Sequence, residues 1–453
     1  MASGGLGDVA GSLPKALRKR LVGCRVVMPL YGGIKQELRD RMQFITHITV
    51  PVSWRRQYCG IFEAKVDGVI FYFIDNEYYF KRDGIYGHYD DAERFAFFSR
   101  AVLEIIPYID FKPDVIHSND WQTALVPVYY STMYANREGY ENIKNIFTIH
   151  NIQYQGVYGK EILGDVFGLG EQHERLLDFG GNLNLMKGAI ECADAVTTVS
   201  PTYAEEILDP WFSHGLDPIL RERQYKLHGI LNGIDTDIYD PEHDAAIVKP
   251  FSAKNPDGKK EDKADLQREF SLPVRDDVPI IGMVSRLVSH KGLDLVKAVL
   301  DELLSTTDVQ LVVLGTGDWE YENFFREVEA RYPGKVGLRI AFIPDLARKI
   351  YAGCDMFLMP SKSEPCGYGT PPIVRETGGL RDSIHDCTLG EGNGFTFKSY
   401  NAHDMLGAIR RALGAYGNRS YWDSLVERAL KCDNSWGRSA REYMRLYRET
   451  VGK

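Results

Sequence analysis

The sequence lacks the features that mark membrane-spanning and disulfide-stabilised proteins. No apolar run approaches membrane-spanning length, and Met1-Ala-Ser-Gly-Gly has no signal-peptide character. The seven cysteines are scattered, odd in number and without a Cys-x-x-Cys pair. This cysteine usage predicts a reducing compartment and no structural zinc. Together with the lack of a long apolar run, it predicts a cytoplasmic protein with no membrane partner.

An excess of positive charge is also lacking, because the net charge is −9. Nucleic-acid-binding domains carry a basic excess, so nucleic acid is not expected as the main partner. A local basic cluster for a phosphorylated small molecule stays compatible with this balance. The length of 453 residues predicts two or three domains, and the apolar share of 44% is that of a globular protein.

Apolar runs alternate with helical patterns in both halves of the chain, which predicts parallel, doubly wound sheets. The expected strands are Arg25 to Leu30, Val69 to Ile74, Asp114 to His117, Asn145 to His150, Ala195 to Ser200, Leu227 to Asp235, Ile280 to Ser285, Val309 to Leu314, Leu338 to Phe342, Met356 to Met359 and Pro372 to Val374. The expected helices are Ala92 to Ile109, Gln122 to Ala135, Leu185 to Cys192, Leu293 to Leu304, Glu320 to Arg331, Leu346 to Gly353, Asn401 to Tyr416 and Ser435 to Tyr447. The polar, Pro- and Lys-rich stretch Tyr239 to Lys263 predicts a linker and a domain boundary.

The chain opens on a glycine-rich stretch, Ser3 to Gly11, that is expected to form a turn running into an amphipathic helix. Glycines let a backbone approach a phosphate closely, but such a loop normally follows a strand. No strand precedes it here. The stretch is therefore either an N-terminal tail or the start of a domain without its first strand.

The stretch Val284 to Asp294 joins a predicted buried strand to a predicted helix. Arg286 lies where the strand ends, and Lys291 lies where the helix begins. Two cations beside a helix N-terminus at the carboxyl edge of a sheet make a site for a polyanion such as a diphosphate. The alternative is an arginine and a lysine on a solvated loop.

Polar residues also follow the strands of the first half. Asp120 comes after one predicted strand, and His150 and Asn151 come after another. Such positions favour ligand contact, although Asp120 as a helix cap and Asn151 as a turn residue are the simpler readings. Gly315-Thr-Gly-Asp318 ends another strand and is either close to a ligand or a plain turn.

Motifs from one end of the chain to the other occur in an order that resembles one family. They are Ser3-Gly-Gly-Leu-Gly-Asp-Val, Asn119-Asp-Trp-Gln-Thr, Thr148-Ile-His-Asn, Val196-Thr-Thr-Val-Ser-Pro-Thr-Tyr-Ala, Gly229-Ile-Leu-Asn-Gly-Ile-Asp, Ser285-Arg-Leu-Val-Ser-His-Lys-Gly, Glu364-Pro-Cys-Gly, Tyr368-Gly-Thr and Thr377-Gly-Gly-Leu. Together they resemble the bacterial glycogen synthases of the starch synthase family, which are retaining glycosyltransferases. The resemblance runs from residue 3 to about residue 449.

The resemblance implies a GT-B fold, an α/β architecture of two Rossmann-like, doubly wound domains that face each other across a cleft. The expected limits are residues 1–240 and 241–435, with a C-terminal helix at 436–453 that crosses back to the first domain. The implied reaction moves glucose from ADP-glucose to the non-reducing end of an α-1,4-glucan such as glycogen, without a metal or cofactor. Whether ADP-glucose or UDP-glucose is preferred stays open.

The resemblance also implies the roles of particular residues. Arg286 and Lys291 would contact the donor diphosphate, and Glu364, His150 and Asp120 would face the transferred glucose. The other expected substrate contacts are Gly4, Gly5, Asp8, Tyr86, Asn151, Asn232, Phe342, Cys366, Gly367, Thr377 and Gly378. Retention is compatible with front-face departure and attack, or with Glu364 as a covalent nucleophile.

The chain departs from the family at two places. Family members have roughly eight more residues after Gly367, where a helix N-terminus holds the donor phosphates. Here only Pro360 to Pro371 joins two predicted strands, although a parallel crossover needs a dozen or more residues and usually a helix. We therefore expect a strained second sheet. The family's first strand also has no counterpart, and its lysine before the Gly-Gly pair falls on Ala2, so a sheet without a central strand is expected, as in a truncated or degenerate copy.

Two other functions compete with an active synthase. A non-catalytic relative that binds glucan or nucleotide would keep the same motifs without turnover. A nicotinamide oxidoreductase is disfavoured, because the only sign of it is glycine-rich turns and no acidic residue stands at the expected place.

Overall fold

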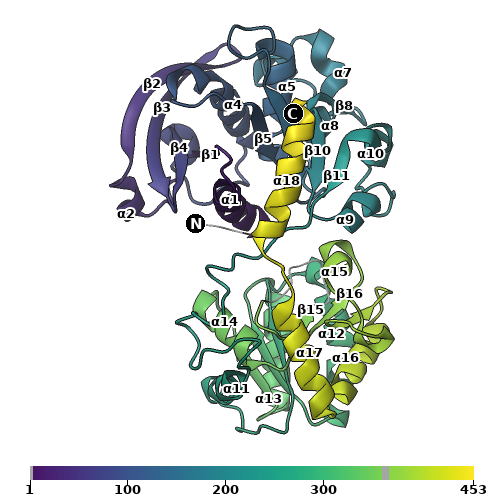
Figure 1. The fold of residues 1–453 in the computed structure, drawn as a ribbon. Helices are drawn as coiled ribbons and strands as arrows, with labels where there is room; N and C mark the ends of the chain where they lie inside the picture. The colour runs from purple at the N-terminus through teal and green to yellow at the C-terminus, as the bar shows by residue number, and fades with distance from the viewer. Residues whose placement is uncertain (1–3, 360–366, 453) are drawn as a thin grey trace. The chain divides into compact units, whose positions relative to one another are not determined.

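The computed structural model describes residues 4–359 and 367–452. The chain forms two compact units: unit 1 is Met1–Asn232 with Ser439–Lys453, and unit 2 is Gly233–Arg438 (Figure 1). The domain limits expected from the sequence, at residues 240 and 435, stay predictions. No helix of the described residues is long and apolar enough to cross a membrane.

Unit 1 contains two separate four-stranded sheets. The first has the order β1-β4-β3-β2, with β1 Arg25–Pro29, β4 Val69–Asp75, β3 Arg55–Val66 and β2 Gln43–Val52. β1 and β4 are parallel, whereas β2 and β3 form a long antiparallel hairpin. The parallel pairing expected from the sequence is therefore wrong for β2 and β3, whose many exposed or half-buried positions do not form a continuous apolar run.

The second sheet of unit 1 is parallel, in the order β11-β10-β6-β5. Its strands are β5 Val115–Asn119, β6 Lys144–Ile149, β10 Ala195–Thr198 and β11 Leu227–Gly229. β11 is much shorter than the expected strand Leu227 to Asp235. A small antiparallel sheet holds β7 Val157–Tyr158, β8 Asp178–Phe179 and β9 Asn182–Asn184. Each large sheet ends on a strand, β1 or β5, that lacks a further partner among the described strands.

Unit 1 also contains helices, several of which pack against these sheets. They are α1 Gly4–Arg18, α2 Gln36–Arg39, α3 Glu77–Phe80, α4 Asp91–Glu104, α5 Leu125–Tyr129, α6 Ile162–Asp165, α7 Glu174–Leu177, α8 Leu185–Cys192, α9 Pro201–Glu206 and α10 Asp217–Glu222, with the larger part of α18 Trp436–Val451. The expected glycine turn is wrong for the described residues, because α1 already begins at Gly4. Val9, Leu13 and Leu17 are buried on one side of α1, and this packing offsets the low helix propensity of glycine.

Unit 2 is built on one six-stranded parallel sheet in the order β14-β13-β12-β15-β16-β17. Its strands are β12 Ile280–Val284, β13 Gln310–Leu314, β14 Val336–Arg339, β15 Met356–Met359, β16 Pro372–Arg375 and β17 Phe395–Phe397. Its helices are α11 Gly258–Glu269, α12 Leu293–Thr306, α13 Trp319–Arg331, α14 Pro344–Gly353, α15 Gly378–Ser383, α16 Ala402–Tyr416 and α17 Arg419–Lys431.

Helices cover both faces of the unit 2 sheet. One core cluster joins Ile281 and Met283 of β12 to α12, and another joins Ile280 of the same strand to Leu266 of α11 and Ile350 of α14. Alternate residues of β12 thus face opposite cores, as in a doubly wound sheet. The parallel alternation predicted for this half is therefore confirmed.

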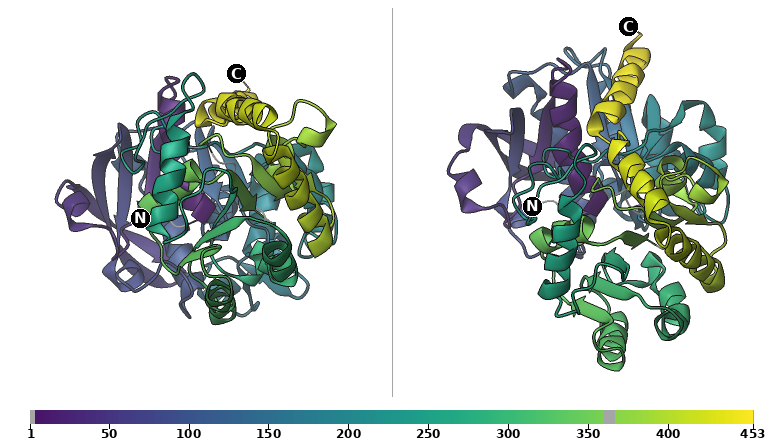
Figure 2. Two further views of the ribbon diagram at one scale, coloured as in Figure 1. Left: turned by 90° about the horizontal axis from the view of Figure 1, so that it is seen from below. Right: turned by 60° about the horizontal axis from the view of Figure 1, so that its bottom comes forward.

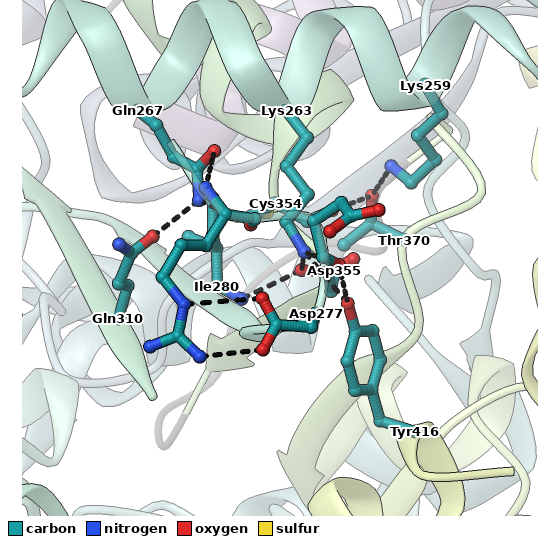
Figure 3. A network of polar contacts seen from close by, with 12 residues as sticks. Lys259, Lys263, Gln267, Asp277, Ile280, Gln310, Cys354, Asp355, Thr370 and Tyr416 are labelled. Carbon is teal, nitrogen blue, oxygen red and sulfur yellow. Dashed lines mark hydrogen bonds and ion pairs between the residues drawn. The ribbon is translucent and has the colours of Figure 1, made fainter. Parts of the chain in front are cut away.

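The predicted linker Tyr239 to Lys263 is partly wrong, because α11 begins inside it at Gly258. The Lys263 side chain is buried, and its Nζ lies 2.8 Å from Asp355 Oδ2 and donates to Tyr416 Oη at 2.8 Å (Figure 3). Asp355 Oδ2 also accepts the N–H of Ile280 at 2.8 Å. This network ties α11 to the amino ends of β12 and β15, so the charged stretch is part of the core.

Candidate functional site

The predicted cation pair lies at the carboxyl end of β12 in unit 2. Arg286 is exposed directly after the strand, and Lys291 is half-buried at the end of a 3₁₀ turn, Ser289–Lys291. Gly292 follows in the left-handed region, with φ 70°, and α12 begins at Leu293. Burial, then the charges of Lys291 and Arg286, lower the pKa of His290. Both cations therefore lie close enough to His290 to affect its pKa, and they lie near the N-terminus of α12, where an anion is favoured.

A glycine pair brings the cation segment to its place. A Cβ at Gly315 would lie 2.0 Å from Ser285 O, and one at Gly317 would lie 2.2 Å from Leu287 O. Leu287 O accepts the N–H of Asp318 at 2.7 Å. Gly315-Thr-Gly-Asp318 was expected to lie close to a ligand or to form a plain turn. The structure supports the turn, because this segment contacts the backbone on both sides of Arg286.

Three further predicted residues follow strands of the same sheet at its carboxyl edge. Thr377 and Gly378 are buried after β16, and Gly378 opens α15 with φ 49°. The Phe342 ring follows β14 and is 86% exposed. The carboxyl edge of the unit 2 sheet therefore combines two cations, a helix start and a free aromatic face.

The predicted residues Glu364 and Cys366 lie outside the described residues. The described chain resumes at Gly367, which is half-buried. Tyr368 Oη donates to Asp244, and Thr370 Oγ1 donates to Tyr351 O at 2.6 Å. The short connection does not prevent the strands from pairing, because β15 and β16 form a regular parallel ladder.

In unit 1, Asp120 lies between β5 and β6 in an unusual backbone conformation, with φ 56° and ψ 179°. Its Oδ1 accepts the N–H of His150 at 2.8 Å and of Asn151 at 3.5 Å. It makes no side-chain capping bond to the turn that follows it. Asp120 therefore joins the carboxyl ends of two strands, and the capping alternative is wrong. Asn151 does have the local turn role, since its Oδ1 accepts the N–H of Gln153 at 3.0 Å.

His150 presents one ring nitrogen that has no partner among the described residues. Its Nε2 lies 3.0 Å from Asn119 Oδ1, whereas its buried Nδ1 has no hydrogen bond. Burial lowers the pKa of His150 to about 4, so the ring is neutral near pH 7. Because the Asn119 oxygen accepts from Nε2–H in this amide assignment, Nδ1 is left as an acceptor suited to a hydroxyl group.

Burial raises the pKa of Asp120 to about 7, and the N–H groups of His150 and Asn151 oppose that rise. Asn119 was not predicted as a site residue. The signal for it was present, because Asn119 opens the Asn-Asp-Trp-Gln-Thr motif that also supplies Asp120.

The remaining predicted residues of unit 1 lie on other segments of the chain. Gly4, Gly5 and Asp8 lie in the first turns of α1. Tyr86 is 59% exposed on the segment before α4. Asn232 is half-buried, and its Oδ1 is buried without a hydrogen bond among the described residues.

One group of side chains in the described part of the chain has the spacing of a metal site. Asp240, Glu242 and His243 offer ligand atoms within 4.8 Å of one another on a mostly exposed loop of unit 2. A hollow of about 440 Å³ also lies in unit 2, lined by Glu376, Arg381, Ile384, His385, Asp386, Gly390, Glu391, Gly392 and Thr396. Neither contains a predicted site residue.

Two family models match the chain. The model described as "Starch synthase catalytic domain" matches residues 1–222, and the model described as "Glycosyl transferases group 1" matches residues 266–424. The glycogen synthase of Geobacillus thermodenitrificans is 51% identical over 463 residues, covering 100% of this chain and 95% of that protein. The glycogen synthase of Bacillus cereus (strain ATCC 10987) is 50% identical over 461 residues, covering 99% of this chain and 97% of that protein.

Solved structures give the same grouping. The catalytic domain of starch synthase IV from Arabidopsis thaliana, bound to ADP and acarbose, superposes with a TM-score of 0.91 at 34% identity, covering 100% of this chain and 97% of that one. Sucrose-phosphate synthase from Thermosynechococcus elongatus superposes with a TM-score of 0.61 at 17% identity, covering 99% of this chain and 94% of that one. The second likeness concerns the fold alone.

Proposed function

The chain belongs to the glycogen and starch synthase family of GT-B glycosyltransferases, and we propose that it transfers glucose from ADP-glucose to the non-reducing end of an α-1,4-glucan with retention of configuration. The observation that carries this proposal is the pair Arg286 and Lys291 beside the start of α12. Their shared influence on His290 supports a single anion site at that edge.

In this reaction the departing ADP develops negative charge on its β-phosphate. Arg286 offers a planar fork of donors to phosphate oxygens, and Lys291 adds a compact charge at the helix N-terminus. Such preorganised donors stabilise the leaving group, and the loss of one costs on the order of 3 kcal/mol in the barrier. Thr377 and Gly378 add the start of α15 to the same edge.

The unit 1 residues act on the transferred glucose in this proposal. The Nδ1 of His150, which has no hydrogen bond to any described residue, accepts a glucose hydroxyl, and Asn119 holds the ring in that tautomer. Asp120 fixes the backbone of His150 and is a positioning residue. Glu364 is assigned to the reacting sugar by its motif, and retention is compatible with a front-face route or with a covalent glycosyl–enzyme.

We also propose that the short segment after Gly367 makes glucose transfer by this chain slower than in relatives with a longer segment. The alignment with the Geobacillus relative spans 463 positions against the 453 residues of the chain, so relatives carry residues that this chain lacks within the aligned span. If these include the helix start that follows Gly367 in the family, part of the phosphate site is absent. A cytoplasmic location belongs to the proposal as well, since the described cysteines form no disulfide with one another.

Incorporation of radiolabelled glucose from ADP-glucose into glycogen tests the proposal. The purified chain is compared with a variant that carries the Geobacillus segment inserted after Gly367, and UDP-glucose serves as the alternative donor. We expect α-amylase-sensitive product from both proteins, with a faster rate from the variant.

Incorporation by the variant alone assigns the loss of activity to the missing segment. Glycogen binding without incorporation by either folded protein contradicts the proposal and favours the non-catalytic glucan-binding alternative.

A further inference from the structure

A hollow of about 370 Å³ in unit 1 has a lining of arginines, away from the residues assigned to the reaction. It is lined by Arg20, Arg441, Met444, Arg445, Arg448 and Glu449. Arg20 follows α1, and the other residues lie on α18, which runs beside α1 within unit 1 (Figures 1 and 2). The hollow therefore lies between α18 and the turn that follows α1, and it includes no residue of a sheet edge.

The placement of α18 separates this hollow from the carboxyl edge of the parallel sheet. Ser439 Oγ donates to Leu231 O just beyond β11, and further along the helix Tyr447 Oη lies 2.8 Å from His117 Nδ1 in the middle of β5. Tyr443 is fully buried against the sheet, whereas Arg441 and Arg445 are exposed. The arginines therefore lie on the outer side of α18, away from His150 and Asp120.

Arginines outnumber acids among the described residues that line the hollow. Four guanidinium groups and one carboxylate line it, although the whole chain has a net charge of −9. Glu449 Oε1 lies 3.8 Å from Arg445 Nε, and Arg441 and Arg448 have no hydrogen bond or ion pair within the described ranges. Arg448 complements the C-terminal end of the α18 dipole, but Arg441 lies about two turns earlier and has no such explanation.

We propose that this hollow binds a small molecule with two or more phosphate groups. Guanidinium forks match phosphate oxygens in pairs, and the formal charge of the lining side chains matches a polyanion. The volume lies at the small end of ligand pockets, and Met444 supplies an apolar wall. A nucleic acid needs a longer basic surface on a basic domain.

Isothermal titration of the full chain with inorganic tripolyphosphate tests this site. The Arg441→Gln/Arg445→Gln/Arg448→Gln variant is compared with the Arg56→Gln control, an exposed arginine on β3 of the same unit. Tripolyphosphate also contacts the donor cations, but that contribution is common to all three proteins. We expect one saturable site fewer in the triple variant, an unchanged isotherm in the control, and about tenfold weaker binding for each single Arg→Gln change.

Glu449→Gln should change the affinity for tripolyphosphate in the opposite direction to the arginine variants, because it removes the one negative charge among the lining residues. We expect it to tighten tripolyphosphate binding and to leave the fold intact by circular dichroism. Isotherms of the wild type and the triple variant that superimpose overturn the proposal. Binding of an oligonucleotide or of anionic vesicles through these arginines, without saturable tripolyphosphate binding, overturns it too.

Discussion

At the scale of single residues, the unit 1 site combines strain with unpaired polarity. Asp120 holds φ 56° and ψ 179°, a conformation that costs a residue with a side chain on the order of 1–3 kcal/mol. The same residue accepts two N–H groups from the neighbouring strand end. This strained residue lies beside His150 Nδ1, a buried nitrogen without a hydrogen bond in the described part of the chain, and the combination points to a function other than stability.

His150→Ala is expected to lower the kcat of glucose transfer by about 100-fold, as for the loss of one preorganised polar contact. The KM for ADP-glucose should change far less, because His150 contacts the glucose and not the diphosphate in our proposal. Steady-state kinetics check this, with the exposed His403→Ala as the control. An unchanged kcat for His150→Ala would remove the residue from the reaction.

The two histidines of unit 1 also predict a pH dependence of stability. Burial lowers the pKa of His150 to about 4, and burial with the charge of His150 lowers that of His117 to about 3. A depressed histidine pKa stabilises the folded state fully above pH 6.5, and the contribution falls as the pH drops toward the folded-state pKa. The free energy of unfolding should therefore decrease as the pH falls from about 6.5 to about 4.

His117→Gln should make this decrease shallower, by at most about 1.4 kcal/mol per pH unit for one proton. Urea denaturation at a series of pH values measures it. The raised pKa of Asp120 acts in the opposite direction, since it lowers stability as the pH rises from about 4 to about 7, but it is common to both proteins. Parallel curves for His117→Gln and wild type would show that His117 does not titrate in this way.

At the scale of helices and strands, continuous apolar runs were predicted well. Met356 to Met359 coincides with β15, and Leu185 to Cys192 coincides with α8. Both are buried almost throughout, so hydrophobicity alone reports their position. The edge positions of Arg286 and Lys291 followed from the same reading, because a strand end and a helix start bracket them.

Elements whose buried side is polar, or whose pattern is interrupted, could not be predicted in this way. α11 buries Asp262, Lys263 and Gln267, which a pattern reading places on the surface. β2 reads Gln43–Val52 with Pro51 near its end and many exposed positions, as befits an edge strand. The contact between His150 and Asn119 joins residues from two strands, and local sequence gives no ring orientation.

The buried pair of Lys263 and Asp355 gives a prediction about this missed helix (Figure 3). Lys263→Met should lower the free energy of unfolding by about 3–5 kcal/mol, because it leaves a buried carboxylate without its cation. Chemical denaturation followed by tryptophan fluorescence measures it. Adding Asp355→Asn should recover most of the loss, since the amide oxygen still accepts the N–H of Ile280.

Lys297→Met is the matched control, because Lys297 forms a surface ion pair with Glu320 at 2.8 Å. Its cost should stay below about 1 kcal/mol. Equal stability of Lys263→Met and wild type would mean that the α11 network does not hold unit 2 together.

At the scale of the whole molecule, the two units have different tasks in the proposed reaction. The residues proposed for the diphosphate, Arg286 and Lys291, belong to unit 2. The residues proposed for the transferred glucose and its support, His150 and Asp120, belong to unit 1. Variants of the two groups should therefore differ in which step they impair, and binding of the leaving nucleotide separates them.

Equilibrium binding of ADP to the full chain is the most direct test of this central claim. We predict that Lys291→Ala weakens ADP binding at least about tenfold, whereas His150→Ala and the exposed Lys297→Ala on α12 leave it unchanged. Wild-type affinity for ADP in folded Lys291→Ala would show that Lys291 does not bind the donor diphosphate.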